Sequence, residues 1–237
     1  MDAIILAAGK GTRLGQISEI IPKSLFQIQG KPIIEYTFQN LPNEIDRVIL
    51  VVGHLNDQIK NFIGNNFLGK TIEFVEVDTL GTGYSVWQCQ DKIKSEKFLV
   101  LNGDDFYNKE ELTSLIEKDR CLGLAISIPK SPKYLSIKID SNNWLTGSNY
   151  VSEKELESGA LIATGAYVLD RGIFNLELVK IQSTGEYGLP QTILKNLTNY
   201  PIKGEVMKYW IQINYPEDIA KAEAILRNKD SIVKSRD

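Results

Sequence analysis

An apolar run that leads directly into a glycine-rich loop is the feature that most constrains the fold. Residues 3–8 are all apolar, as in a strand that is buried on both faces of a parallel sheet. The loop at 9–14 follows at once and contains two glycines. Because backbone N–H groups in such a turn can approach an anion closely, we expect a phosphate-binding loop at the carboxyl end of this strand.

Strands and helices alternate through the first half of the chain. Further buried strands are predicted at 47–52, 71–77, 98–101 and 123–128. Helices are predicted at 32–38, 56–63, 82–93 and 109–118. This order predicts an α/β fold: a Rossmann-like, mostly parallel sheet with helices on both faces. Ligands of such sheets bind beyond the carboxyl ends of the strands, so we expect the site in the loops after Ala8, Val77 and Leu101.

The second half of the chain has a different pattern. Strands are predicted at 135–139, 144–149, 161–168, 202–207 and 209–213, with helices at 189–197 and 216–226. The segment at 152–158 is predicted to be an exposed charged loop. We expect one domain over residues 1–227, whose second half adds a platform of mixed strands, and a loose polar tail at 228–237.

Composition excludes several classes of protein. A chain of 237 residues with 43% hydrophobic and 24% charged residues is an ordinary globular protein, and its net charge of −3 argues against a nucleic-acid partner. No apolar stretch approaches the ~20 residues that span a membrane. Cys89, Cys121 and His54 are too few and too far apart for a thiolate or histidine metal cluster. We expect two buried free thiols and a cytoplasmic protein, and a homo-oligomer is allowed.

Two common phosphate-binding motifs do not fit the glycine loop. A dinucleotide fingerprint needs a third glycine where Leu14 stands, and no segment has the glycine, lysine and serine or threonine spacing of a P-loop. Arg13 offers a planar charged fork for phosphate oxygens, and Lys23 offers a point charge from a second loop. These cations strengthen the prediction of a phosphate site without identifying it as either motif.

Seven segments together resemble a known family. They are 6–14 (LAAGKGTRL), 22–25 (PKSL), 30–36 (GKPIIEY), 80–83 (LGTG), 101–104 (LNGD), 164–167 (TGAY) and 216–219 (PEDI). In this order they are similar to motifs of the sugar-1-phosphate nucleotidyltransferases, in a short single-domain form. The resemblance implies that a nucleoside triphosphate reacts with a phosphorylated acceptor, most simply a sugar 1-phosphate, to give an activated diphosphate and pyrophosphate. The mixed-strand half would bind the acceptor.

The resemblance also implies roles for particular residues. Arg13 and Lys23 would be the catalytic cations, and Asp104 would bind Mg²⁺. The residues expected to bind the nucleotide are Leu6, Ala7, Ala8, Gly9, Gly11, Thr12, Arg13, Glu76, Gly81, Thr82 and Asp104. Such a transfer needs positioning and charge neutralisation but no covalent nucleophile, which fits the scarcity of histidine and cysteine.

The second metal ligand departs from the family pattern. Many members have an aspartate near the end of the domain, and Gln212 occupies that position here. Asn214, two residues later, matches the acid of branches that use cytidine nucleotides. We predict Asn214 as the second Mg²⁺ ligand and Gln212 as the next candidate, because an amide oxygen can coordinate this ion. Asp105, the neighbour of Asp104, is expected to point elsewhere.

The substrates are less well defined. Three acceptor-side hallmarks of the family are absent, in the segments 133–136 and 149–152 and at Ala163. Candidate acceptor-binding residues are Gly165, Glu186 and Lys154. Glu76 and Asp78 favour a base with donor edges, so GTP or CTP is preferred and UTP or dTTP stays open. Two alternatives remain: a cytidylyltransferase for a phosphocholine-like or amino-alcohol phosphate, and an inactive regulatory relative that binds nucleotides.

Overall fold

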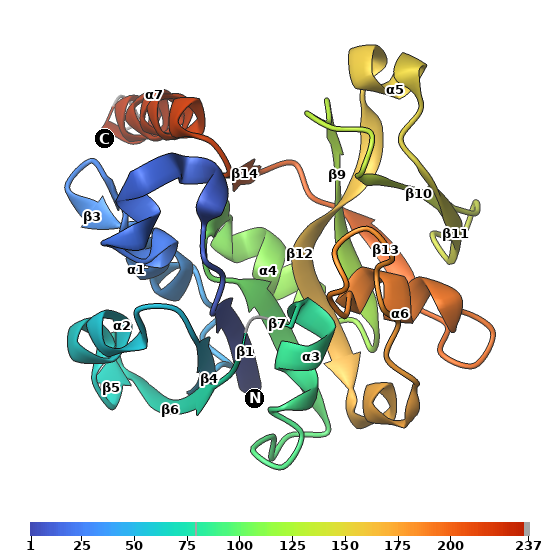
Figure 1. Cartoon of the computed structure of the whole chain (residues 1–237), viewed down its shortest axis with the longest axis horizontal. Helices are drawn as coiled ribbons and strands as arrows, with labels where there is room; N and C mark the ends of the chain where they lie inside the picture. Colours follow the sequence, from blue (N-terminus) through green and yellow to red (C-terminus); the bar gives the residue numbers. More distant parts are fainter. Residues whose placement is uncertain (79, 235–237) are drawn as a thin grey trace.

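The computed structural model describes the backbone of residues 1–78 and 80–234 and the side chains of this part as far as Arg227. An eight-stranded sheet forms its centre (Figure 1). In spatial order the strands are β13 (Lys203–Val206), β9 (Cys121–Ser127), β12 (Ala160–Asp170), β7 (Lys97–Asn102), β1 (Asp2–Ala7), β4 (Arg47–Val52), β6 (Lys70–Glu76) and β5 (Asn66–Phe67). The strands β7, β1, β4 and β6 are parallel, whereas β12 and β5 run antiparallel to their neighbours.

Helices cover both faces of this sheet. They are α1 (Ile33–Gln39), α2 (Asn56–Ile63), α3 (Thr82–Trp87), α4 (Lys109–Ile116) and α6 (Leu189–Lys195). Alternate side chains of β1 point to opposite faces: Ile5 packs in one core with α1, α2 and α4, and Ile4 packs in another with α3 and α6. The predicted Rossmann-like α/β fold is therefore confirmed, and both of its cores are built from the continuous apolar runs.

Smaller elements complete the structure. Three two-stranded sheets pair β2 (Gln27–Ile28) with β3 (Lys31–Pro32), β8 (Asp105–Tyr107) with β14 (Trp210–Gln212), and β10 (Leu135–Ile139) with β11 (Leu145–Tyr150). The 3₁₀ helices are η1 (Thr12–Glu19), η2 (Lys23–Leu25) and η3 (Arg171–Asn175), and the remaining helices are α5 (Glu153–Ser158) and α7 (Pro216–Lys234). A third apolar cluster joins Ala222 of α7 to Phe26, Ile28 and Phe106. This cluster places β14 and the start of α7 beside the glycine loop.

Three predictions differ from the structure by more than two residues. Helix α3 ends at Trp87 rather than at residue 93, and a series of tight turns follows, with Cys89 N bonded to Val86 O. The segment predicted as a charged loop forms α5, because Ser152 and Glu155 make a reciprocal capping box. Helix α7 continues to Lys234 through most of the predicted loose tail, and residues 235–237 of that tail lie outside the described part.

Both cysteines are buried and free, as expected. Burial raises the pKa of each thiol to about 12, so neither is a thiolate at neutral pH. Within the described residues, no helix combines the length and the apolar character needed to cross a membrane.

Candidate active site

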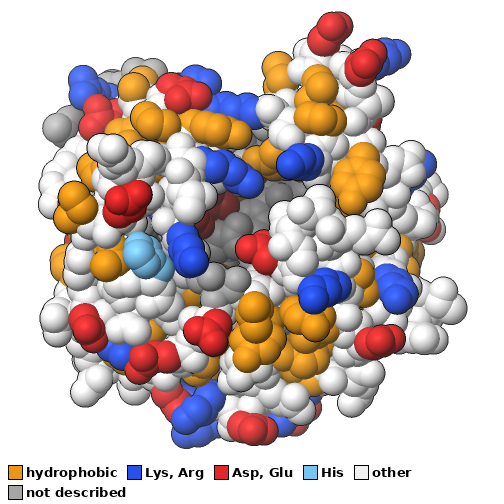
Figure 2. Space-filling view, viewed as in Figure 1, with side chains coloured by type: hydrophobic (Ala, Val, Ile, Leu, Met, Phe, Trp, Pro, Cys, Tyr) orange, Lys and Arg blue, Asp and Glu red, His pale blue; other side chains and the backbone are white. Residues whose placement is uncertain are grey.

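The carboxyl ends of the parallel strands meet along one edge of the sheet, and three adjoining cavities lie there. The molecular face in Figure 2 is hollowed near its centre, with basic and acidic side chains around the hollow. A small cavity of about 220 Å³ shares lining residues with a cavity of about 520 Å³ and with another of about 580 Å³. We call them the glycine-loop cavity, the Gly81 cavity and the Tyr134 cavity.

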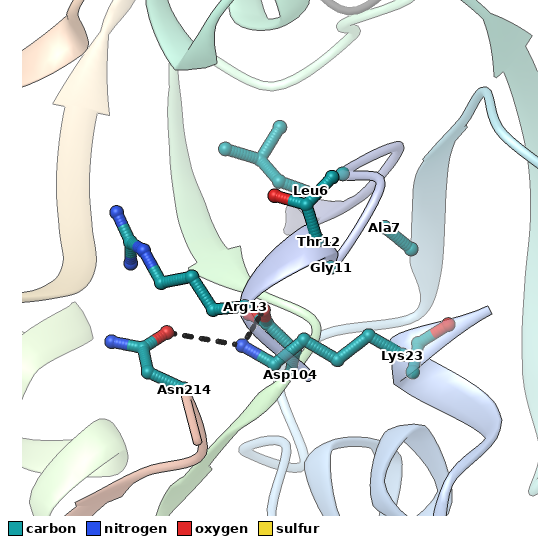
Figure 3. A pocket seen from close by; sticks show the side chains of 10 residues that line it. Leu6, Ala7, Gly11, Thr12, Arg13, Lys23, Asp104 and Asn214 are labelled. Atoms are coloured by element: carbon teal, nitrogen blue, oxygen red, sulfur yellow. Dashed lines mark hydrogen bonds and ion pairs between the residues drawn. The ribbon is translucent and has the colours of Figure 1, made fainter. Parts of the chain in front are cut away.

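The glycine-loop cavity collects most of the residues predicted from the sequence. It is lined by Leu6, Ala7, Gly9, Gly11, Thr12, Arg13, Lys23, Ser24, Asp104 and Asn214 (Figure 3). Arg13 enters it from η1, Lys23 from η2 and Asp104 from the turn after β7. Asn214 comes from the loop after β14, more than 100 residues further along the chain than Asp104. The fold thus brings both predicted cations and both preferred metal ligands to one place.

The Lys23 ammonium lies between the two predicted metal ligands. Its Nζ is 2.5 Å from Asp104 Oδ2 and donates a hydrogen bond of 3.2 Å to Asn214 Oδ1 (Figure 3). Only 8% of Lys23 is exposed, so this charge is largely removed from water and depends on these two oxygens. A carboxylate oxygen and an amide oxygen therefore already face a common positive charge.

The donors in this cavity suit Mg²⁺ better than a metal that needs a closed protein cage. Within the described residues, no group of three or more His, Cys, Asp and Glu side chains is arranged to hold a metal ion. Mg²⁺ is commonly bound by one or two protein oxygens together with phosphate oxygens and water. Asp104 and Asn214 fit this pattern, with Ser24 at the cavity wall. Ser24 Oγ is buried without a hydrogen-bond partner in the described structure, as expected for a donor that awaits a ligand oxygen.

Gln212, the second candidate ligand, does not line the glycine-loop cavity. Its side-chain oxygen accepts a hydrogen bond of 3.1 Å from the Tyr134 hydroxyl, and the residue lines the Tyr134 cavity instead. The same hydroxyl accepts a hydrogen bond of 3.1 Å from Asn214 Nδ2. The geometry therefore favours Asn214 over Gln212 as the partner of Asp104.

Asp105 lies beneath the site and not in it. Only 1% of the residue is exposed, and its Oδ2 accepts hydrogen bonds from Asn102 Nδ2 at 3.3 Å and Trp210 Nε1 at 3.2 Å. Burial, and then the charge of Asp104, raise the pKa of Asp105 to about 7. Asp105 points away from the cavity as predicted, and it links the end of β7 to β14.

The Gly81 cavity joins the glycine loop to the segment before α6. Its lining includes Ala8, Gly81, Thr82, Glu186 and Tyr187. Tyr187 N donates to Leu80 O at 2.7 Å and Gly83 N donates to Tyr187 O at 2.8 Å, so the two segments run side by side. Gly81 has a φ of 103°, and a Cβ at this position would lie 2.4 Å from Tyr187 O. Glycine is therefore required here both by conformation and by space.

The Tyr134 cavity has a mixed lining of cations and apolar groups. Its residues are Arg13, Thr82, Ser131, Lys133, Tyr134, Leu135, Ile137, Ile162, Ala163, Pro190, Gln191, Gln212 and Tyr215. Arg13 is shared with the glycine-loop cavity, and the Gly81 cavity shares Thr82, Pro190 and Gln191. Burial raises the pKa of Tyr134 even though Arg13 lies near, so its hydroxyl keeps its proton at neutral pH.

Three predicted site residues lie elsewhere. Glu76 is bound to Lys60 Nζ at 2.6 Å and to Asn56 Nδ2 at 3.1 Å, outside the three cavities. Lys154 is exposed on α5 and lines none of them. Gly165, with a φ of 78°, packs against the Asn102 side chain, where a Cβ would lie 2.1 Å from Asn102 Nδ2. Gly165 therefore lies against Asn102, which lines the Gly81 cavity, and Gly165 itself lines none of the three cavities.

Sequence reasoning missed two residues of the site. Tyr134 lies in a segment considered only for the family glycine that it lacks, and nothing in the sequence placed it beside Asn214. Ser24 belongs to the PKSL motif, but only the structure shows its hydroxyl buried at the cavity wall. A polar residue directly after a predicted phosphate-binding lysine was the one signal available for Ser24.

The structure is an α/β protein in which the glycine loop and a small charged cavity adjoin two larger cavities. The family model described as nucleotidyl transferase matches residues 2–234, and the chain belongs to this family. The resemblance found in the sequence motifs is thereby confirmed.

Individual relatives agree with this membership. The chain is 32% identical over 232 residues to the bifunctional protein GlmU of Methanococcus maripaludis, covering 97% of this chain but only 55% of that protein. It is 32% identical over 221 residues to the D-glycero-alpha-D-manno-heptose 1-phosphate guanylyltransferase of Campylobacter jejuni, covering 92% of this chain and 96% of that protein. It also resembles the crystal structure of HddC from Yersinia pseudotuberculosis in complex with GMP-PN, with 26% identity, a TM-score of 0.70 and coverage of 95% and 99%.

Proposed function

We propose that the chain transfers the nucleotidyl group of a nucleoside triphosphate to a sugar 1-phosphate. An oxygen of the acceptor phosphate attacks the α-phosphorus and forms a new P–O bond. The bond from the α-phosphorus to the oxygen that bridges to the β-phosphorus breaks, and pyrophosphate leaves with that electron pair. The products are a nucleoside-diphosphate sugar and pyrophosphate, and no covalent enzyme intermediate is needed.

One observation carries this proposal: a small charged cavity shares lining residues with two larger cavities, which also border one another and are each large enough for a substrate. The Gly81 cavity would take the nucleoside, the glycine-loop cavity the triphosphate, and the Tyr134 cavity the acceptor. Arg13 borders the second and third of these, where the acceptor phosphate and the α-phosphorus would meet. Such an arrangement makes the reaction effectively unimolecular and favours it by positioning.

The residues of the glycine-loop cavity supply the charge that the reaction needs. Arg13 and Lys23 would neutralise the triphosphate, while Gly11 and Thr12 present the loop to it. Asp104 and Asn214 would hold Mg²⁺, which when bound offsets phosphate charge and fixes the triphosphate in line with the acceptor. These cations would also stabilise the negative charge that develops on pyrophosphate as it leaves.

The nucleotide proposed first is GTP. Two relatives that align over nearly their whole length are named heptose 1-phosphate guanylyltransferases, and the similar HddC structure contains GMP-PN. The carboxylate of Glu76 is engaged by Lys60 and Asn56, so this proposal does not rely on it as the base-reading group. CTP, UTP and dTTP are the alternatives that a direct comparison distinguishes.

The acceptor proposed is a sugar 1-phosphate rather than a cationic amino-alcohol phosphate. The Tyr134 cavity is lined by Arg13 and Lys133, and its described lining contains no carboxylate. A choline-like ammonium group would meet two like charges there without an acid to offset them. Glu186 lines the Gly81 cavity, so we assign its carboxylate to the nucleoside side and not to the acceptor. We further propose the cytoplasm as the compartment, because both cysteines are free thiols.

Pyrophosphate release from paired substrates tests the proposal. The protein is incubated with Mg²⁺, each of the four triphosphates and a panel of acceptors that includes hexose, heptose and amino-alcohol phosphates. We expect release only when triphosphate and acceptor are both present, and fastest with GTP and a sugar 1-phosphate. Pyrophosphate release with an amino-alcohol phosphate as acceptor, and with none of the sugar phosphates, would contradict the acceptor assignment. Triphosphate binding without release for any acceptor would favour a regulatory nucleotide-binding protein.

A further inference from the structure

The Tyr134 hydroxyl links two amides at the edge of the glycine-loop cavity. It donates to Gln212 Oε1 at 3.1 Å and accepts from Asn214 Nδ2 at 3.1 Å. Tyr134 directly precedes β10, whereas both amides belong to the segment that contains β14. The contact therefore joins parts of the chain that are about 80 residues apart in sequence.

The orientation of the Asn214 side chain decides whether it offers an acceptor or a donor to the cavity. An amide has one oxygen and one NH₂ group, and a half-turn exchanges them. Lys23 Nζ can only donate, so the atom that faces it must be Oδ1. At the opposite end, Nδ2 faces the Tyr134 oxygen, which accepts. Lys23 thus requires this orientation, and the Tyr134 hydroxyl matches it because its own proton is donated to Gln212 Oε1.

The backbone of Asn214 is held separately from its side chain. Asp218 Oδ2 accepts hydrogen bonds from Asn214 N at 3.0 Å and Tyr215 N at 2.9 Å. Lys130 Nζ lies 2.7 Å from the other oxygen of the same carboxylate. With the backbone fixed by Asp218, rotation of the side-chain amide is the freedom that remains, and Tyr134 restrains it.

We propose that Tyr134 is a positioning residue that holds the Asn214 carbonyl oxygen beside Asp104, toward the bound cation. This inference rests on the proposed function, in which these two oxygens hold Mg²⁺. Groups that orient a metal ligand in this way commonly change metal affinity about 10- to 100-fold when they are removed. The Asn214 side chain must be oriented because only one end of its amide is an oxygen. A carboxylate at position 214 would present an oxygen in either orientation.

The test compares nucleotide binding with and without Mg²⁺. The triphosphate that binds the wild-type protein best is titrated calorimetrically, without acceptor, first in Mg²⁺ and then in EDTA. The dissociation constant in EDTA divided by that in Mg²⁺ is the coupling ratio, which measures how much Mg²⁺ strengthens nucleotide binding. We expect Tyr134→Phe to reduce this ratio about tenfold, as loss of an orienting group does. Tyr150→Phe, on the exposed strand β11, should leave it unchanged.

A second background separates orientation from general damage. In Asn214→Asp the coupling ratio should change less than about twofold when Tyr134→Phe is added, since either carboxylate oxygen can serve. An equal reduction in both backgrounds, or none in the wild-type background, would overturn the positioning role. Thermal unfolding of each variant identifies any that fail to fold. If Tyr134→Phe alone fails to fold, the comparison of Asn214→Asp with the Asn214→Asp, Tyr134→Phe double variant tests the positioning role. If the wild-type protein binds none of the four triphosphates, the proposed function fails with it.

Discussion

At the scale of single residues, Arg13 has the most exposed position of the proposed catalytic cations. It lies at the junction of the glycine-loop and Tyr134 cavities. Replacement by alanine should lower kcat/KM about 100-fold, because a fixed positive charge is lost where charge develops in the transition state. Steady-state kinetics measure this loss. Arg227→Ala, which removes an exposed arginine from α7, is the control and should leave kcat/KM unchanged.

The buried hydroxyl of Ser24 gives a prediction in which affinity and stability change differently. Because Ser24 Oγ has no partner in the described structure, Ser24→Ala should leave the free energy of unfolding unchanged or raise it by up to about 1 kcal/mol. The same change should weaken triphosphate binding about tenfold through loss of a hydrogen bond to a charged oxygen.

Ser18→Ala is the matched control for Ser24. Its hydroxyl donates to Gly15 O at 2.7 Å, so its removal should cost about 1 kcal/mol of stability. Urea unfolding and calorimetry measure both quantities in each variant. A destabilised Ser24→Ala protein with normal affinity would show that the hydroxyl serves the fold and not the ligand.

Sequence reasoning could predict those site residues that lie in motifs with a direct chemical reason. Arg13 lies in a glycine turn, Lys23 lies in the PKSL motif and Asp104 follows a buried strand, and all three line one cavity. Glu76 also lies at the carboxyl end of a strand, but an ion pair with Lys60 holds its carboxylate outside the site. A local sequence pattern does not reveal an ion-pair partner 16 residues away. For the same reason, the sequence alone did not predict that Tyr134 lies beside Asn214.

At the scale of elements, the contact between the Gly81 turn and Tyr187 closes one wall of the Gly81 cavity. Gly81→Ala would force a Cβ against Tyr187 O and strain a φ of 103°. We expect triphosphate affinity to fall on the order of 10- to 100-fold, as when a binding segment is displaced by about 1 Å.

Gly69→Ala distinguishes displacement from backbone strain. Gly69 also has a positive φ, of 78°, but a Cβ there would meet open space. The Gly69→Ala protein should therefore lose about 1 kcal/mol of stability through backbone strain, while its affinity for the triphosphate stays normal. Equal affinities in the two variants, measured by calorimetry, would mean that the contact with Tyr187 does not shape the cavity.

The start of β1 is anchored by a charged network that predicts a pH dependence of stability. Burial disfavours the charged form of Asp2 and by itself would raise its pKa. Hydrogen bonds from Lys94 N and Ser95 N, together with the Arg47 guanidinium, outweigh burial and lower the pKa of Asp2 below its ordinary 3.8. The stabilisation is therefore complete above pH 3.8 and is lost as pH falls through the lowered value.

The variant Asp2→Asn tests this dependence. It should be less stable than the wild-type protein by on the order of 2 kcal/mol at pH 7, and the difference should shrink below pH 4. Urea unfolding across this pH range measures it. Asp46→Asn is the control, because Asp46 is 85% exposed and its ion pair with the N-terminus is 3.5 Å long. A difference for Asp2→Asn that does not change with pH would contradict the charge-based account.

Long buried elements were predictable, whereas short ones were not. The boundaries of β4 and α2 agree with the prediction because apolar runs and one apolar helix face determine them. Strand β8 has three residues and depends on pairing with β14, which lies about 100 residues away. Helix α5 buries no residue and depends on its capping box, so no hydrophobic pattern could reveal it.

At the scale of the whole molecule, binding of a Mg²⁺–triphosphate should stabilise the chain as a unit, because the residues proposed to hold it come from both halves of the sequence. At a concentration of about 100 times Kd, mass action adds about 2.7 kcal/mol. For a protein of this size that raises Tm by roughly 5 to 10 °C. Thermal melts with each triphosphate, with and without Mg²⁺, measure the shift. No shift with any of the four would contradict the assigned site.

The fate of the phosphorus atoms distinguishes nucleotidyl transfer from other reactions of a triphosphate. Reactions with GTP and a sugar 1-phosphate are run in parallel with label in the α- or in the γ-phosphate, and the products are separated. Nucleotidyl transfer places the α-label in the nucleoside-diphosphate sugar and the γ-label in pyrophosphate, and both products require the acceptor. Transfer of γ-label to the acceptor, or its appearance as inorganic phosphate, would contradict nucleotidyl transfer, and so would an absence of product with all four triphosphates.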